Sequence, residues 1–224
     1  MTIRTLRGRY LLRRLALAVL ASAALGSALS VSTAMAQMPS KSEYSRLNPA
    51  RPVATGPRIE VIEFFYYGCP VCYELQPYLS RWLVQAPNYI AHRRVPVLSA
   101  DGWEPFAKLY YSLEAIGELA RLHWPVYDNF HFDGVALNQE KAMLDWVARN
   151  GIDRDRFAAV YGSPEIKAKL DETRALMKSY DVRAVPTIVV DGKYVSSARM
   201  AGGTRQLMRV VDELVQQARK ERPN

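Results

Sequence analysis

Two cysteines, Cys69 and Cys72, are the only ones in this chain of 224 residues, and two residues separate them. Thiols at this spacing can close a small disulfide. An apolar segment precedes them and a helical pattern begins at Pro70, so the helix would direct unpaired backbone N–H groups and its positive dipole end at the first sulfur. This environment favours the thiolate form of Cys69. The pattern therefore indicates a thiol–disulfide redox centre.

Two other uses of the cysteines fit less well. A structural bridge across so short a loop removes little entropy from the unfolded chain. A metal site needs more ligands, and the three histidines, His92, His123 and His131, are dispersed along the sequence. We interpret them as packing or solvent-exposed residues, with His123 and His131 on either side of a Trp124–Pro125 turn. We expect no metal and no other cofactor.

The N-terminus has the pattern of an export signal. Five arginines precede an apolar stretch from Leu15 to Leu29, and Ala34-Met35-Ala36 is a small-residue end. The stretch is shorter than the roughly 20 residues that span a bilayer, which argues against an uncleaved membrane anchor. We predict that residues 1–36 are a cleavable signal peptide and that the mature protein is periplasmic. Sec-type export is expected, although Arg13-Arg14 leaves the Tat route open.

Charge and composition exclude other classes of function. The formal net charge of the chain is +8, but five of its 30 lysines and arginines lie in the leader, which leaves 25 against 22 acidic side chains, a net +3. No basic run with interleaved aromatic residues stands out, so we expect no nucleic-acid partner. Export also places the two cysteines in a compartment where disulfides persist.

The order of expected elements begins with residues 37–57, a surface arm or edge strand. Ile59–Tyr67 is almost continuously apolar, which favours a central strand covered on both faces. A helix should follow from Pro70 to about Gln85, with Pro77 as a kink, and a strand over Tyr89–Leu98 would complete a βαβ unit.

Residues 100–181 have a helical pattern that interrupts this α/β unit. The strand pattern returns at Thr187–Val190 and Tyr194–Ser197, joined by a tight two-residue Asp191-Gly192 connection, and a helix over Thr204–Lys220 ends the chain. The expected parts are thus residues 58–99, the helical insertion over 100–181, and 182–224. The helical segments are expected at Glu104–His123, Asn138–Asn150, Arg154–Tyr161 and Pro164–Tyr180.

Three short motifs carry a family resemblance. Glu63-Phe64-Phe65, Cys69-Pro70-Val71-Cys72 and Val185-Pro186-Thr187 together resemble a thioredoxin-fold oxidoreductase of the DsbA type. The resemblance covers nearly the whole mature chain. It implies an α/β, thioredoxin-like fold with an inserted helical domain.

The resemblance also implies a mechanism. A substrate thiolate attacks Cys69, the nucleophilic cysteine of the pair, and releases Cys72, the resolving partner; a second substrate thiolate then expels Cys69. Pro70 and Val71 would tune the redox chemistry. DsbA-like proteins commonly have histidine in place of Val71, and valine supplies neither a donor nor a charge. A helix terminus contributes at most about 2 kcal/mol, and one pKa unit costs about 1.4 kcal/mol, so backbone N–H groups must supply any larger shift.

Three further site residues are expected. Burial of Glu63 in the apolar strand should raise its proton affinity, and its family position implies a proton relay to Cys72 through water. The alternative is an edge-strand glutamate that reaches solvent. The resemblance implies a cis bond between Val185 and Pro186 facing the dithiol, with the Val185 backbone free to pair with a substrate segment; an ordinary trans proline is the alternative.

The resulting hypothesis is a periplasmic protein dithiol oxidase. Its substrates would be unfolded, newly exported proteins, and a membrane partner resembling DsbB would reoxidise it. We expect a monomer, because no dimerisation region is visible. The alternatives are a disulfide isomerase or reductase that uses the same thiols, and a non-redox periplasmic holdase.

Overall fold

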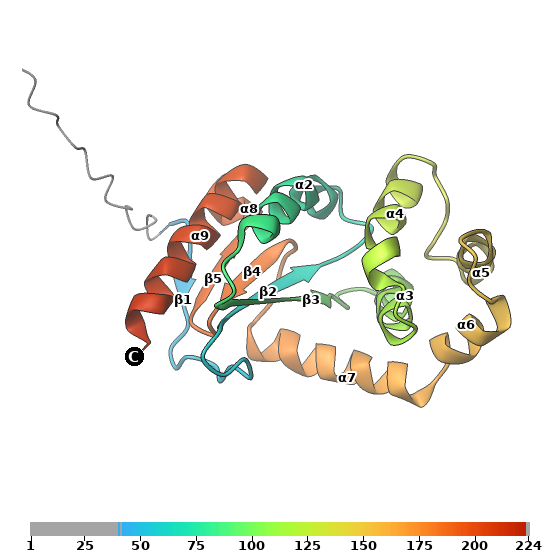
Figure 1. Cartoon of the computed structure of the whole chain (residues 1–224), viewed down its shortest axis with the longest axis horizontal. Coiled ribbons are helices and arrows are strands. Elements are labelled where there is room, and N and C mark those ends of the chain that lie inside the picture. The colour runs from blue at the N-terminus through green and yellow to red at the C-terminus, as the bar shows by residue number, and fades with distance from the viewer. Residues whose placement is uncertain (1–39, 41, 223–224) are drawn as a thin grey trace, which may run out of the picture. The chain divides into compact units, whose positions relative to one another are not determined.

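A five-stranded mixed sheet organises the described part of the chain, which is residue 40 and residues 42–222 of the computed structural model. The predicted signal peptide, residues 1–36, lies outside the described residues. The strand order is β1-β5-β4-β2-β3 (Figure 1). The strands are β1 (Ser45–Arg46), β2 (Ile59–Phe65), β3 (Ile90–Pro96), β4 (Thr187–Val190) and β5 (Tyr194–Ser197).

Strand β2 is central, as the continuous apolar run predicts, and all of its residues are buried. It pairs in parallel with β3 and antiparallel with β4, so the predicted βαβ unit is confirmed. The strand ends at Phe65, two residues earlier than expected. The reason is a tight turn, in which the Cys69 N–H donates to the Tyr66 carbonyl at 3.0 Å and starts helix α2 (Pro70–Gln85).

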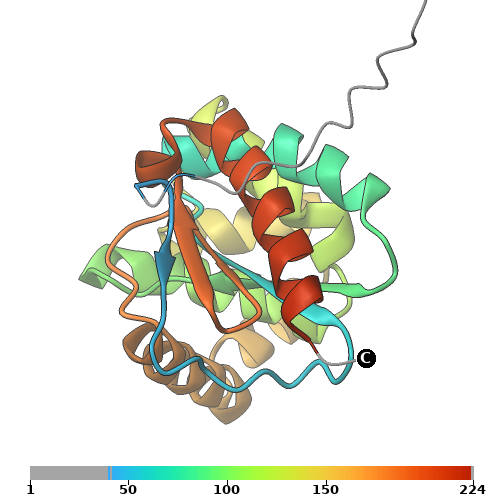
Figure 2. The same cartoon turned by 90° about the vertical axis from the view of Figure 1, so that its left-hand side faces the viewer.

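Helices cover both faces of the sheet. On one face, α2 and α9 (Thr204–Glu221) pack on Ile59, Val61 and their neighbours in β4. On the other face, Ile62 and Phe64 pack against the C-terminal end of α7 (Pro164–Ser179). Figures 1 and 2 show α7 across the sheet from α2 and α9. These layers match the α/β expectation, in which helices on both faces of the sheet shield the central strand from water.

The segment between β3 and β4 is helical, as predicted, but its first helix is divided. Gly117 has a φ of +78°, and the chain turns there because the Glu118 N–H donates to the Leu113 carbonyl at 2.8 Å. The prediction of one helix over Glu104–His123 is therefore wrong, and so is the Trp124–Pro125 turn, which lies inside α4. The elements here are η1 (Asp101–Trp103), α3 (Glu104–Ala115), α4 (Leu119–His131), α5 (Glu140–Arg149) and α6 (Arg154–Tyr161).

The β4–β5 hairpin has the predicted strand bounds, but three residues join the strands instead of two. Asp191 and Gly192 both have positive φ, at 54° and 63°, and the Lys193 N–H closes the turn on the Val190 carbonyl at 3.0 Å. A Cβ on Gly192 would lie 2.1 Å from the Arg51 carbonyl oxygen. Only glycine fits at this position.

Two residues of the N-terminal arm form an edge strand, and the other described residues of the arm are irregular or in turns. Strand β1 pairs antiparallel with β5. A short helix, α8 (Ala198–Ala201), connects β5 to α9. None of the helices among the described residues has the length and apolar character needed to cross a membrane.

Candidate active site

The dithiol lies at the N-terminus of α2, where the sequence places it. Cys69 is the N-cap residue, and its sulfur accepts a hydrogen bond from the Cys72 backbone N–H at 3.4 Å. Pro70 follows at the first helical position, where its missing N–H has no helical acceptor to lose. Cys69 is partly exposed, whereas Cys72 is fully buried, and both are free thiols. Only Cys69 can be reached from solvent.

The two thiols have opposite proton affinities. The pKa of Cys69 falls from 9.0 to about 6, chiefly because the Cys72 thiol donates a hydrogen bond to the Cys69 sulfur. Burial opposes this fall, and the backbone N–H groups of Cys72 and Val71 add to it. Burial raises the pKa of the Cys72 thiol well above its ordinary value. The pair therefore combines one thiolate with one neutral thiol at neutral pH.

The causes of the low Cys69 pKa correct the sequence argument in one respect. That argument assigned the shift beyond the helix dipole to backbone N–H groups, and it missed the donor on the Cys72 side chain. Val71 contributes its backbone N–H only, and the residue is 40% exposed. As expected, neither Pro70 nor Val71, the two residues between the cysteines, offers a charged or polar side chain to the thiolate.

Gly68 precedes the dithiol at a point where a side chain would displace the Tyr66 ring. A Cβ there would lie 2.6 Å from the ring and hydroxyl of Tyr66. The Tyr66 ring in turn stacks on Trp103, with ring centroids 4.0 Å apart. The stacked arrangement of these two rings thus favours glycine immediately before Cys69.

Glu63 lies beneath the dithiol with its side chain fully buried. Its two oxygens accept hydrogen bonds from Gln76 Nε2 at 2.8 Å and from Arg94 Nε at 3.0 Å. Gln76 Nε2 also donates to the Cys72 carbonyl at 3.3 Å, which connects Glu63 to the helix that carries the thiols. Because β2 is a central strand, the alternative of an edge-strand glutamate is wrong.

Burial dominates the electrostatics of Glu63. Desolvation raises the pKa of its carboxyl, although the charge of Arg94 and the hydrogen bonds from Gln76 and Arg94 lower it in part. His92 Nε2 is 3.9 Å from the carboxylate, but desolvation and Arg94 lower the pKa of His92 to about 3. At neutral pH this histidine therefore brings no compensating charge.

The Val185–Pro186 peptide bond is cis, which the family resemblance implied, so the trans alternative is wrong. The Val185 carbonyl lies 3.8 Å from the Cys69 sulfur, within reach of a weak S–H···O contact. Of the predicted site residues, the fold thus brings Val185 next to Cys69, although the two are 116 positions apart in the sequence. Gln76 connects Glu63 to the Cys72 backbone by hydrogen bonds.

Sequence reasoning missed four polar residues around the site. Gln76 lies one helical turn after Cys72, and this spacing was a usable signal. Arg94 is the register partner of Glu63, which only the strand pairing reveals. His123 and His131, interpreted as packing or solvated residues, both bond to Tyr67, at 2.7 Å in each case. Among the described residues, no group of three or more potential ligands forms a metal site.

Comparison with known proteins agrees with this geometry. Residues 99–215 match the family model of the DSBA-like thioredoxin domain, a span that includes Val185 and Pro186 and begins after the two cysteines. The thiol:disulfide interchange protein DsbA of Azotobacter vinelandii is 36% identical over 177 residues, 79% of this chain and 83% of that protein. The same-named protein of Bordetella pertussis is 34% identical, over 90% of this chain and 96% of its own length.

Solved structures give the same result. A crystal structure of a Pseudomonas aeruginosa DsbA variant is 30% identical, with a TM-score of 0.78 over 82% of this chain and 100% of that one. The oxidoreductase DsbA from Xylella fastidiosa is 26% identical, with a TM-score of 0.76 over the same shares of the two chains. Fold, dithiol and sequence all lead to one conclusion: this chain belongs to the DsbA-like family of thioredoxin-fold thiol:disulfide oxidoreductases.

Proposed function

We propose that this protein is a periplasmic dithiol oxidase that donates the Cys69–Cys72 disulfide to newly exported proteins. The observation that carries the proposal is the difference between the two thiols. Cys69 is accessible and has a pKa of about 6, whereas Cys72 is buried and has a pKa well above its ordinary value. A thiolate that is stabilised in the reduced enzyme makes the enzyme's disulfide more oxidising.

The reaction proceeds by two exchanges. A substrate thiolate attacks the Cys69 sulfur of the oxidised enzyme, the Cys69–Cys72 bond breaks, and Cys72 leaves as a thiolate that takes up a proton. A second thiolate of the substrate attacks the substrate sulfur of the mixed disulfide and expels Cys69, which stays a thiolate. The substrate dithiol loses two electrons and the enzyme disulfide gains them, so the step balances.

Glu63 is proposed as the proton relay for Cys72. Its raised pKa allows the carboxyl to carry a proton, and its hydrogen bond to Gln76 leads to the Cys72 carbonyl. A water molecule between the carboxyl and the thiol would complete the transfer. The relay supplies a proton to the leaving Cys72 in oxidation and accepts it when the enzyme is reoxidised.

Substrate binding is proposed at Val185 and Pro186. The Val185 carbonyl borders Cys69, so an extended substrate segment that pairs with this backbone would bring its own cysteine to the exposed sulfur. Such backbone pairing is independent of side chains and suits a broad range of unfolded substrates. Pro70 and Val71 are proposed to tune the thiolate.

The cellular setting is proposed from the leader and from the family. Residues 1–36 would be the cleavable signal peptide. The parts of the mature chain would be an arm over 37–57, the thioredoxin domain over 58–99 and 182–224, and the helical insertion over 100–181. A DsbB-like membrane protein would reoxidise the dithiol, and the enzyme would act as a monomer.

Equilibration of the purified protein with glutathione buffers tests the proposal. The states of Cys69 and Cys72 are measured by thiol alkylation and mass spectrometry. We expect the pair to be reduced even in oxidising buffer, as a disulfide donor requires. A pair that stays oxidised until strongly reducing conditions would contradict the oxidase and indicate a reductase or a structural bridge.

A second assay separates the oxidase from its alternatives. Reduced, unfolded ribonuclease should gain disulfides with oxidised enzyme in stoichiometric amount, and a Cys69→Ser/Cys72→Ser variant should do nothing. Faster repair of scrambled disulfides than of reduced protein would favour an isomerase. Protection against aggregation that survives the double substitution would favour a holdase.

A further inference from the structure

Helix α4 of the helical region contacts the chain on both sides of the dithiol. Tyr67 lies two residues before Cys69, and Tyr73 lies directly after Cys72. Each of the two tyrosines makes a hydrogen bond and an aromatic contact with α4. The dithiol loop is therefore attached to the helical region before and after its two sulfurs.

The contact before the dithiol is made by two histidines. Tyr67 is fully buried; its hydroxyl is 2.7 Å from His123 Nδ1, and its carbonyl is 2.7 Å from His131 Nε2. A carbonyl oxygen can only accept, so His131 Nε2 carries a hydrogen and donates it. This bond holds the backbone of the turn that ends at Cys69.

The contact after the dithiol is a stacked pair. The rings of Tyr73 and His131 are parallel within 1°, with centroids 5.1 Å apart. The Tyr73 hydroxyl donates to Asp128 at 2.5 Å, and its backbone N–H donates to the Cys69 carbonyl at 3.1 Å. Tyr73 is thus fixed to α4 by its side chain and to Cys69 by its main chain.

We infer that His131 is a positioning residue for the dithiol, acting on the reaction proposed above. Its side chain contacts both flanking residues, with its Nε2–H on the Tyr67 carbonyl and its ring face on Tyr73. Tyr127 also packs against both tyrosine rings, but the His131 bond is to the backbone of the turn. The Cys69 sulfur receives the Cys72 N–H at 3.4 Å only while the turn and the start of α2 keep their relative position. Loss of the His131 bond releases the turn, weakens this contact and raises the proton affinity of Cys69.

Three variants separate the two contacts of His131. His131→Phe keeps a ring to stack on Tyr73 and removes the donor. His131→Gln places an amide nitrogen close to the position of Nε2 and keeps the donor, whereas the shorter His131→Asn does not reach the Tyr67 carbonyl. The measurements are the Cys69 pKa from thiolate absorbance and the equilibrium constant with glutathione.

We expect His131→Phe and His131→Asn to raise the pKa of Cys69. They should also shift the glutathione equilibrium about three- to fivefold toward the oxidised enzyme. His131→Gln should stay within about twofold of the wild type. The expected size of these effects depends on the hydrogen-bond donor and not on the ring. The comparison of His131→Asn with His131→Gln therefore tests the inference even if His131→Phe does not fold.

Arg121→Ala is the matched control. Arg121 lies on the same helix and donates to Glu118 and to the Asn150 carbonyl, at 2.7 and 3.0 Å, without contacting the turn. It should leave the Cys69 pKa and the equilibrium constant unchanged. If His131→Asn and His131→Phe lower the unfolding temperature yet also leave both quantities unchanged, His131 is merely structural and the inference is overturned. A wild-type pair that fails to oxidise substrate thiols would instead contradict the proposed function.

Discussion

Two buried carboxylates, one in the β4–β5 turn and one in β2, differ in their partners. Asp191, in the β4–β5 turn, is 4% exposed and forms ion pairs with Arg222 and with Lys193, the latter at 3.2 Å. Glu63, beneath the dithiol, is completely buried and has one cationic partner, Arg94. One carboxylate is surrounded by positive charge, and the other is only partly compensated.

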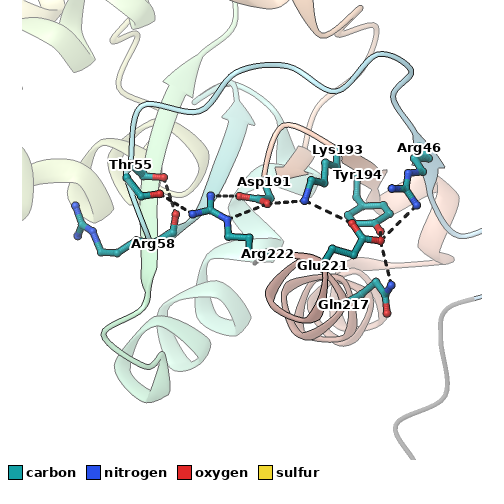
Figure 3. A network of polar contacts seen from close by, with 10 residues as sticks. Arg46, Thr55, Arg58, Asp191, Lys193, Tyr194, Gln217, Glu221 and Arg222 are labelled. Carbon is teal, nitrogen blue, oxygen red and sulfur yellow. Dashed lines mark hydrogen bonds and ion pairs between the residues drawn. The ribbon is translucent and has the colours of Figure 1, made fainter. Parts of the chain in front are cut away.

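The network around Asp191 connects segments that are far apart in the sequence (Figure 3). Arg222 at the end of α9 also donates to the Gly56 carbonyl at 2.6 Å, and Lys193 lies 3.5 Å from Glu221. Although burial raises the pKa of the Glu221 carboxyl, hydrogen bonds from Tyr194 and Gln217 and the charges of Arg46 and Lys193 lower it overall. These charges are paired, so they hold the arm, the hairpin and α9 together.

The contrast between Asp191 and Glu63 shows that a buried carboxylate can either stabilise the fold or take part in proton transfer. At Glu63 desolvation exceeds the effect of its partners, so the carboxyl has a raised pKa and can bind a proton. The same imbalance raises the pKa of the Cys72 thiol. Complete pairing gives stability, whereas incomplete pairing gives a group whose protonation can change during a reaction.

Arg222→Met should give the largest effect on stability. Methionine keeps most of the side-chain volume but leaves Asp191 buried with Lys193 alone and breaks the bond to Gly56. We expect the free energy of unfolding to fall by about 2 kcal/mol, with an unchanged glutathione equilibrium. Urea unfolding of the oxidised protein and thiol alkylation measure the two quantities.

Arg183→Met is the control for this change. Arg183 forms an ion pair with Asp181 at 2.7 Å, but their side chains are 82% and 70% exposed. Its removal should change the free energy of unfolding by less than about 0.5 kcal/mol. Equal losses in the two variants would mean that burial does not distinguish the network around Asp191.

Local patterns in the sequence predict most of the fold. The apolar run at Ile59, the helix start at Pro70 and the hairpin strands all follow from short-range signals, and the structure confirms them. Gly117 was missed because a single glycine inside a helical pattern is compatible with an uninterrupted helix. The three-residue hairpin connection was missed because Asp191-Gly192 is also typical of a two-residue turn.

The site is predictable where the chemistry is local and not where it depends on pairing. A lowered pKa of Cys69 could be predicted from its place before a helix, but the chief cause, the hydrogen bond from the Cys72 thiol, was missed. The hydrogen bonds of Arg94 to Glu63 and of His131 to Tyr67 join residues 31 and 64 positions apart. No periodicity in the sequence encodes such contacts, because strand register and helix docking decide them.

Val71→His should increase the difference in proton affinity between Cys69 and Cys72, because it adds a positive charge beside the Cys69 thiolate. Imidazolium beside the Cys69 thiolate favours the charged form, so the pKa of Cys69, about 6 in this chain, should fall by about one unit. The glutathione equilibrium should shift about tenfold toward the reduced enzyme. Thiolate absorbance against pH measures the pKa, and Val71→Asn, polar but uncharged, is the control. A Cys69 no more acidic in the histidine variant would contradict the role of position 71.

Glu63→Gln should give the smallest of the three effects and tests whether the buried Glu63 carboxyl relays a proton. The amide cannot carry a relayed proton, so steps in which Cys72 gains or loses its proton should slow about fivefold, a modest loss because water can substitute. Stopped-flow reduction of the oxidised enzyme by a thiol peptide, followed by tryptophan fluorescence, measures the rate.

The pH dependence of stability gives an independent test of the same residue. The pKa of Glu63 is raised in the folded state, so its contribution is fully present below the ordinary value of 4.5 and is lost as the pH rises through the folded-state pKa. The stability of Glu63→Gln relative to the wild type should therefore increase with pH above about 4.5.

Glu60→Gln is the matched control for the kinetic experiment, because Glu60 is also buried in β2 and pairs with Arg93 at 3.2 Å. If both substitutions slow the reduction of the oxidised enzyme equally, the loss of rate comes from disturbing the strand. If only Glu63→Gln slows it, the Glu63 carboxyl is the group that relays the proton of Cys72.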